Sequence, residues 1–164
     1  MKRLLIIALA AAACSRPGPN APAEYRPADG SFSASLPGGW KVDDSLGETR
    51  KAAFFGPPSG PGAWTEMIRV SLYPATTPQA YRATRPGLPT PLQETAAGGA
   101  KALEFLSNSE FRDPHAGVKK LSSRVVMLPT AQGLFVLEHA WPDGAPASRE
   151  AFAGLLSTFK PKSP

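Results

Sequence analysis

The stretch VKKLSSRVVMLPTAQGLFVLEHAW, residues 118–141, decides the fold. Two apolar runs, VVML and LFVL, flank a break at residues 129–132. Strands that are apolar on both faces are typical of a covered sheet, and two such strands joined by a short connection pair as a hairpin. We therefore predict a hairpin here that is buried on both faces.

Alternation of apolar and polar residues predicts strands elsewhere in the chain. In SFSASL, residues 31–36, the apolar residues alternate with serines. In TEMIRVSLY, residues 65–73, Ile68, Val70 and Leu72 share one face. A period of two is the pattern of a strand with one buried face. Further strands are expected at residues 40–42, 50–55, 92–96 and 100–111, with turns at residues 37–39, 97–99 and 113–117.

Two helices are predicted as well. Thr77 and Pro78 supply an N-cap and a proline at the first helical position, so a short helix is expected over residues 78–84. In SREAFAGLLSTF, residues 148–159, the large apolar residues fall on one helical stripe, with Ser148 as the N-cap. Antiparallel strands followed by an amphipathic helix indicate an α+β fold, a twisted antiparallel sheet flanked by helices.

The N-terminus has the layout of an export signal. A basic head, Lys2 and Arg3, precedes an apolar run over residues 4–13, which as a helix reaches about 15 Å, half of a bilayer's hydrocarbon core. The run ends at Cys14, the only cysteine of the chain, and LAAAACS, residues 9–15, resembles the lipobox of bacterial lipoproteins. That resemblance implies cleavage before Cys14, a diacylglyceryl thioether on its sulfur and acylation of the freed amine.

Other roles for Cys14 fit its surroundings poorly. A disulfide needs a second cysteine, which the chain lacks. A reactive thiol needs a structured, electropositive pocket, and a metal site needs further ligands nearby, whereas Cys14 lies between the apolar run and a proline-rich stretch. An ordinary secreted protein with an incidental cysteine stays as the alternative, because Ala11, Ala12 and Ala13 also form a small-residue cleavage site.

Composition divides the chain into three parts. Residues 1–13 are the predicted lipoprotein signal peptide, and residues 14–29 are the lipidated cysteine with a proline-rich, extended tether. Residues 30–164 form one predicted domain, because about 150 residues remain after cleavage. In Gram-negative lipoproteins an aspartate after the cysteine favours the inner membrane, so Ser15 indicates the periplasmic face of the outer membrane.

Four segments of the predicted domain resemble the PsbP-like superfamily. They are LPGGW, VSLY, GLFVL and LSTF, at residues 36–40, 70–73, 133–137 and 156–159. The superfamily includes the photosystem II extrinsic protein, a Ran-binding nuclear import factor and bacterial envelope lipoproteins of the DcrB kind, and the lipobox favours the last group. Over residues 30–160 the resemblance implies an α/β/α sandwich that works as a non-catalytic accessory or binding protein.

No catalytic or cofactor motif is present in the sequence, and we expect no cofactor and no metal. Asp113, His115 and His139 could mimic an open zinc site, but Asp-Pro-His-Ala-Gly is ordinary turn sequence. Glu138 and His139 cannot act as a catalytic pair, because neighbouring strand residues point to opposite faces. One of the two is expected to be partly buried and hydrogen-bonded. A histidine-dependent hydrolase is the third and least favoured function.

The net charge of the chain is +5, and no Lys/Arg run exceeds two residues, so nucleic-acid binding is not expected. Aromatic and arginine side chains near the proline-rich loops are candidates for a surface that binds a partner or ligand. They are Trp64, Tyr73, Tyr81, Arg82, Arg85 and Trp141. We expect a membrane-anchored, non-enzymatic accessory or partner-binding protein. The second hypothesis is a small-ligand carrier with an apolar pocket beneath the loops of Trp64 or Trp141.

Overall fold

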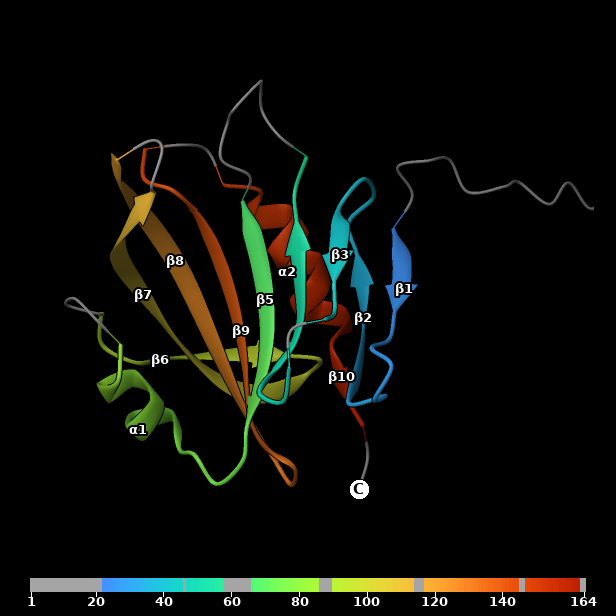
Figure 1. Cartoon of the computed structure of the whole chain (residues 1–164). Helices are drawn as coiled ribbons and strands as arrows, with labels where there is room; N and C mark the ends of the chain where they lie inside the picture. Colours follow the sequence, from blue (N-terminus) through green and yellow to red (C-terminus); the bar gives the residue numbers. More distant parts are fainter. Residues whose placement is uncertain are drawn as a thin grey trace, which may run out of the picture.

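The computed structural model describes residues 22–45, 47–57, 66–85, 90–113, 117–144 and 147–162 (Figure 1). Its main element is a seven-stranded antiparallel sheet in the order β3-β4-β5-β9-β8-β7-β6, and a second sheet has the order β1-β2-β10. The strands are β1 Ala23–Tyr25, β2 Phe32–Leu36, β3 Lys41–Asp43, β4 Arg50–Phe55, β5 Met67–Tyr73, β6 Gln93–Ala97, β7 Ala100–Asp113, β8 Gly117–Thr130, β9 Gly133–Pro142 and β10 Lys160–Pro161. The helices are α1 Pro78–Ala83 and α2 Arg149–Thr158.

The predicted hairpin is the β8–β9 pair, and it lies inside the large sheet. Residues 134–140 of β9 are all buried, so the expectation of burial on both faces is confirmed. The break is shorter than expected, because Pro129 stays within β8, opposite Leu134. β7 pairs with β8 only as far as Met127, so Pro129 lies where β8 has only one paired neighbour, which is where a strand tolerates proline.

One face of the large sheet is covered by α2 and the small sheet. Figure 1 shows α2 behind β4 and β5, beside β2 and β10. The ring centroid of Phe135 on β9 lies 6.3 Å from that of Phe32 on β2 and 5.3 Å from that of Phe159 after α2. The rings of Phe32 and Phe159 stack at 5.1 Å. These three buried rings join the two sheets and the helix into one core, which also holds the predicted stripe of α2.

The opposite face of the large sheet is covered by α1. Tyr81 of α1 packs into a second buried cluster with side chains of β7, β8 and β9. Thr77 caps the helix as predicted, since its hydroxyl accepts a hydrogen bond of 3.2 Å from the N–H of Ala80. With one helix on each face of a twisted antiparallel sheet, the predicted α+β class is confirmed. No helix in the described ranges has the length and apolarity to cross a membrane.

Two short strands differ from the expectation. β1 lies within residues 14–29, the expected tether, yet it pairs with β2 from Ala23↔Leu36 to Tyr25↔Ala34. Its Tyr25 ring lies 5.1 Å from the ring of Phe54, which gives this polar segment an apolar anchor. The folded part therefore includes β1, and the predicted boundary at residue 30 is too late. β10 pairs with the other edge of β2, where a simple helix end was expected.

Candidate functional site

Glu138 of β9 is 5% exposed and lies on the sheet face that α1 covers. Arg69 stands directly opposite on β5, and its Nη2 donates to one carboxylate oxygen of Glu138. Arg85, two residues after α1, donates from its Nη2 to the other oxygen. A buried carboxylate needs such partners, because charge removed from water is unfavourable without them. Burial alone would lower the pKa of Arg69, but Glu138 raises it above its usual value.

The two arginines line a polar hollow of about 580 Å³. Arg50, the first residue of β4, contributes a third guanidinium group, and Ser71 and Tyr73 of β5 line the same hollow. Residues 48–49 complete its rim. We call these five side chains, Arg50, Arg69, Ser71, Tyr73 and Arg85, the arginine pocket. Guanidinium groups with tyrosine and serine hydroxyls are typical of sites that hold anionic groups.

Tyr81 of α1 lies against Tyr73 of the arginine pocket. The ring centroids of Tyr73 and Tyr81 are 5.1 Å apart, and the Cζ of Arg85 lies 5.6 Å from the Tyr81 centroid. A neighbouring hollow of about 360 Å³ shares Tyr73 and Arg85 with the pocket and is also lined by Ala80 and Thr84. Burial raises the pKa of the Tyr81 hydroxyl, so this group stays neutral. The structure thus brings together three of the predicted surface residues, Tyr73, Tyr81 and Arg85.

The other predicted surface residues lie elsewhere. Arg82 turns away to the segment before β6, since its Nε and Nη2 donate to the carbonyl of Thr90 at 3.2 and 3.1 Å. Trp141 lies on the opposite sheet face, where its ring centroid is 5.1 Å from that of His139. Trp64, Cys14 and His115 fall outside the described residues. The structure therefore brings three of the six predicted surface residues together, and their role in binding a partner or ligand stays a prediction.

Arg50, Arg69 and the structural importance of Glu138 were not predicted from the sequence. Alternation along β5 places Arg69 on the same face as Tyr73, so the shared face of these two pocket residues could be predicted from the sequence. The contact between Arg69 and Glu138 joins residues 69 positions apart and depends on the register of β5 against β9. No local pattern encodes that register.

His139 lies on the other face of β9 and is 1% exposed. Its Nε2 is 2.8 Å from the carboxylate of Glu66, just before β5. An ionised carboxylate can only accept, so Nε2 carries the proton. Glu66 also accepts from the hydroxyl of Ser148 and, at 2.9 Å, from its N–H. Ser148 is the N-cap residue of α2, but its side chain bonds Glu66, so the expected side-chain cap is absent.

Both polar residues of β9 are therefore buried and hydrogen-bonded, whereas only one was expected to be. Glu138 ties β5 and the end of α1 to one sheet face, and His139 ties Glu66 and the start of α2 to the other. Within the described ranges, no group of three or more His, Cys, Asp or Glu side chains could hold a metal ion. The zinc site considered from the sequence depends on His115, outside these ranges.

Acid should destabilise the fold through His139 and Glu66. Burial lowers the pKa of His139, so the folded ring stays neutral where an unfolded histidine, of usual pKa 6.5, becomes protonated. Burial alone would raise the pKa of Glu66, but the hydrogen bonds from Ser148 and His139 outweigh it and lower this pKa below 4.5. In both cases the unfolded chain binds the proton first as the pH falls, so stability is lost on acidification.

We expect the free energy of unfolding in urea to fall between pH 7 and pH 5, and to fall less in His139→Gln. The amide keeps a donor for Glu66 but does not titrate in this range. His115→Gln is the matched control, because it removes the other histidine of the chain. An unchanged pH dependence in His139→Gln would contradict the assignment.

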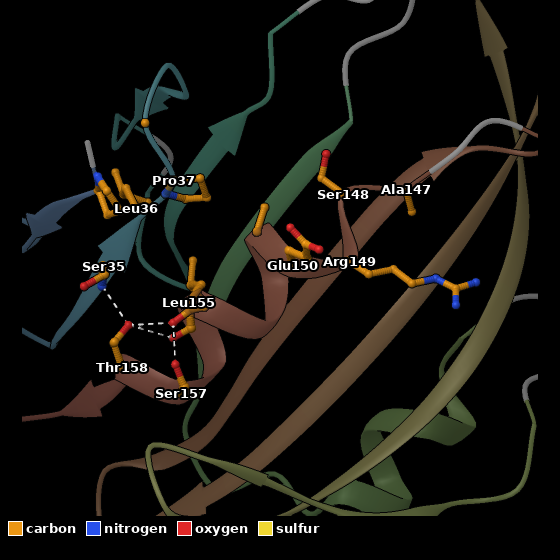
Figure 2. Close-up of a pocket in the computed structure, with 14 residues that line it drawn as sticks. Ser35, Leu36, Pro37, Ala147, Ser148, Arg149, Glu150, Leu155, Ser157 and Thr158 are labelled. Carbon is orange, nitrogen blue, oxygen red and sulfur yellow. Dashed lines mark hydrogen bonds between the residues drawn. The ribbon is translucent and has the colours of Figure 1, made fainter. Parts of the chain in front are cut away.

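An apolar groove of about 840 Å³ lies between the end of β2 and α2 (Figure 2). Leu36, Pro37 and Leu155 line it, and it stays open beside α2, where a Cβ added at Gly154 would meet nothing within 4 Å. The hydroxyl of Thr158 bridges β2 and α2, since it accepts from the N–H of Ser35 at 2.9 Å. Trp141 does not line this groove, and Trp64, the other tryptophan of the predicted carrier pocket, lies outside the described residues.

Comparisons with known proteins support the fold alone. No family model matches the chain, and no curated protein matches it significantly. Among solved structures, the chain is similar to a crystal structure from Bacteroides thetaiotaomicron VPI-5482, with a TM-score of 0.58 and 16% sequence identity. The similarity covers 85% of this chain and 48% of that one, so this chain spans about half the length of that protein. The molecule is an α+β protein with an arginine-lined pocket.

Proposed function

We propose that this protein is a lipid-anchored protein of the bacterial cell envelope whose domain works by binding a partner. The observation that carries the anchor is the position of Cys14, directly after an apolar run that ends in small residues. A single fatty chain gives only marginal membrane binding at ~0.8 kcal/mol per buried methylene, whereas the several chains of a bacterial lipoprotein give a lasting anchor. Ser15 supports a place on the periplasmic face of the outer membrane.

The binding role is supported by how the described side chains are used. Glu138 and His139, the buried ionisable residues of β9, are engaged in bonds that hold strands and helices together. Three arginines and one tyrosine line the surface hollow of the arginine pocket, and both residue types are typical of recognition surfaces. The resemblance to the PsbP-like superfamily also supports a binding role, because most members of that superfamily are non-catalytic. We propose this membership as part of the function.

A second candidate function is the binding of a small ligand. The arginine pocket favours it, because it is a hollow lined by several convergent polar groups next to two aromatic rings. A hydrolase that depends on His139 receives no such support, since this ring is 1% exposed and bonded to Glu66.

The anchor is tested by replacing Cys14. The chain as it stands should be found in the membrane fraction and should incorporate labelled palmitate, whereas Cys14→Ala should be soluble and unlabelled, because the acceptor sulfur is gone. Ser15→Ala is the matched control and should stay in the membrane. Ser15→Asp should move the protein from the outer to the inner membrane. Membrane retention of Cys14→Ala without label would refute the anchor.

A further inference from the structure

The arginine pocket holds more hydrogen-bond donors than Glu138 can satisfy. Glu138 accepts from one nitrogen of Arg69 and one of Arg85, whereas each guanidinium group carries five N–H donors. The Nε of Arg85 is buried and has no hydrogen-bond partner among the described residues. An unpaired buried N–H is unfavourable, so an acceptor that reached this group would stabilise it.

Arg50 adds positive charge to the same hollow without bonding Glu138. Two carboxylates, those of Glu48 and Asp43, lie near Arg50. Glu48 is exposed at the rim, and Asp43 is already engaged by Ser45, whose N–H and hydroxyl donate to it at 3.1 and 2.6 Å. Three guanidinium groups therefore line one hollow, with a single buried carboxylate bonded between two of them. An anion with several oxygens complements this arrangement.

The aromatic side of the pocket indicates more than an inorganic ion. Tyr73 and Arg85 line both the polar hollow and the neighbouring one, so the two hollows meet at these residues. The neighbouring hollow offers the Tyr81 ring and the methyl group of Ala80. A ligand with a charged group among the arginines could place its apolar part here.

We propose that the arginine pocket binds a small organic anion, with its carboxylate or phosphate group held by Arg50, Arg69 and Arg85 and its organic part against Tyr73. Both groups share the chemistry that matters, charged oxygens that accept from guanidinium donors. This ligand proposal shares one premise with the function proposed above, namely that the domain acts by binding. It does not depend on the lipid anchor, so either idea can fail alone.

The test uses the full chain carrying Cys14→Ala, which removes the attachment site of the lipid and leaves the pocket unchanged. Phenyl phosphate and benzoate are the probes for isothermal titration calorimetry. At least one of them should bind, with an affinity that falls as sodium chloride is raised. Benzyl alcohol, which has the same ring and no charge, should not bind. Inorganic phosphate should bind more weakly than phenyl phosphate if the pocket prefers the phosphate probe.

Two substitutions at the rim of the pocket leave the bonds of Glu138 to Arg69 and Arg85 intact. Arg50→Gln should weaken binding of the preferred probe about tenfold or more, because it removes one charged donor. Glu48→Gln should strengthen binding a few-fold, because it removes a repelling charge at the rim. Arg26→Gln is the matched control: Arg26 is an exposed arginine bonded to Glu24, it does not line the pocket, and its loss should leave binding unchanged.

Three results would overturn the proposal. One is that neither probe binds at millimolar concentration. Another is that Arg50→Gln binds as well as the parent chain, or that Arg26→Gln loses as much. The third is binding to vesicles that contain phosphatidylglycerol, dependent on Arg50, with no binding of either soluble probe. That result would assign the pocket to a membrane surface instead of a small molecule.

Discussion

Glu138→Ala should lower the free energy of unfolding by about 3–5 kcal/mol, the range observed when one partner of a buried ion pair is removed. Arg69 and Arg85 would be left facing each other without their shared carboxylate, and their side chains are only 25% and 20% exposed. The substitution also releases the link between β5, β9 and the end of α1. Urea unfolding followed by tryptophan fluorescence measures the loss.

The matched control for this substitution is Glu104→Ala. Glu104 pairs with Arg124 across β7 and β8, but its side chain is 21% exposed and that of Arg124 32% exposed. Solvent reaches the Glu104 carboxylate more than that of Glu138, which is 6% exposed, and only one arginine bonds it, so its loss should cost about 1 kcal/mol or less. If Glu138→Ala cost no more than Glu104→Ala, the buried carboxylate would not be the link that we describe.

Phe135→Ala should lower the free energy of unfolding by about 3–5 kcal/mol, as is usual when a buried phenylalanine is replaced by alanine. The Phe135 ring is fully buried and lies against Phe32 from the small sheet and Phe159 from the end of α2. Its removal leaves a cavity where the two sheets and the helix meet. Thermal and urea unfolding of the purified variant should show the same loss.

Two further substitutions bracket the Phe135 prediction. Phe135→Leu keeps most of the apolar volume and should cost about half as much or less. Leu106→Ala removes an apolar side chain that is 51% exposed, so its effect should stay within about 0.5 kcal/mol. A loss in Phe135→Ala as small as that in Leu106→Ala would contradict the proposed core.

Much of the fold could be predicted because its elements carry local signals. Alternation identified β2 and β5, and the unbroken apolar runs identified β8 and β9 as buried on both faces. Thr77 and Pro78 marked the start of α1, and the apolar stripe of α2 marked the face that the sheet would cover. These features depend on a few neighbouring residues, so they can be read from the sequence alone.

The missed features depend on distant partners. β1 has three residues and β10 two, too few for a periodic pattern, and each exists because β2 offers a free edge. Serine is a favoured N-cap residue, but the hydroxyl of Ser148 donates its hydrogen bond to Glu66, which is far from it in sequence. The arginine pocket likewise needs the β5–β9 register and the path of the chain after α1 before Arg69 and Arg85 can meet.

The place of β2 between β1 and β10 has a consequence for how the chain folds. Ser35 and Thr158, which bond across this region, are 123 residues apart. Contacts over such separations require a large loop to close and slow the folding of a domain. Synthesis begins at the N-terminus, so β2 lacks one of its two neighbours until β10 has been made. The small sheet is therefore expected to form late, together with the stacking of Phe32 on Phe159.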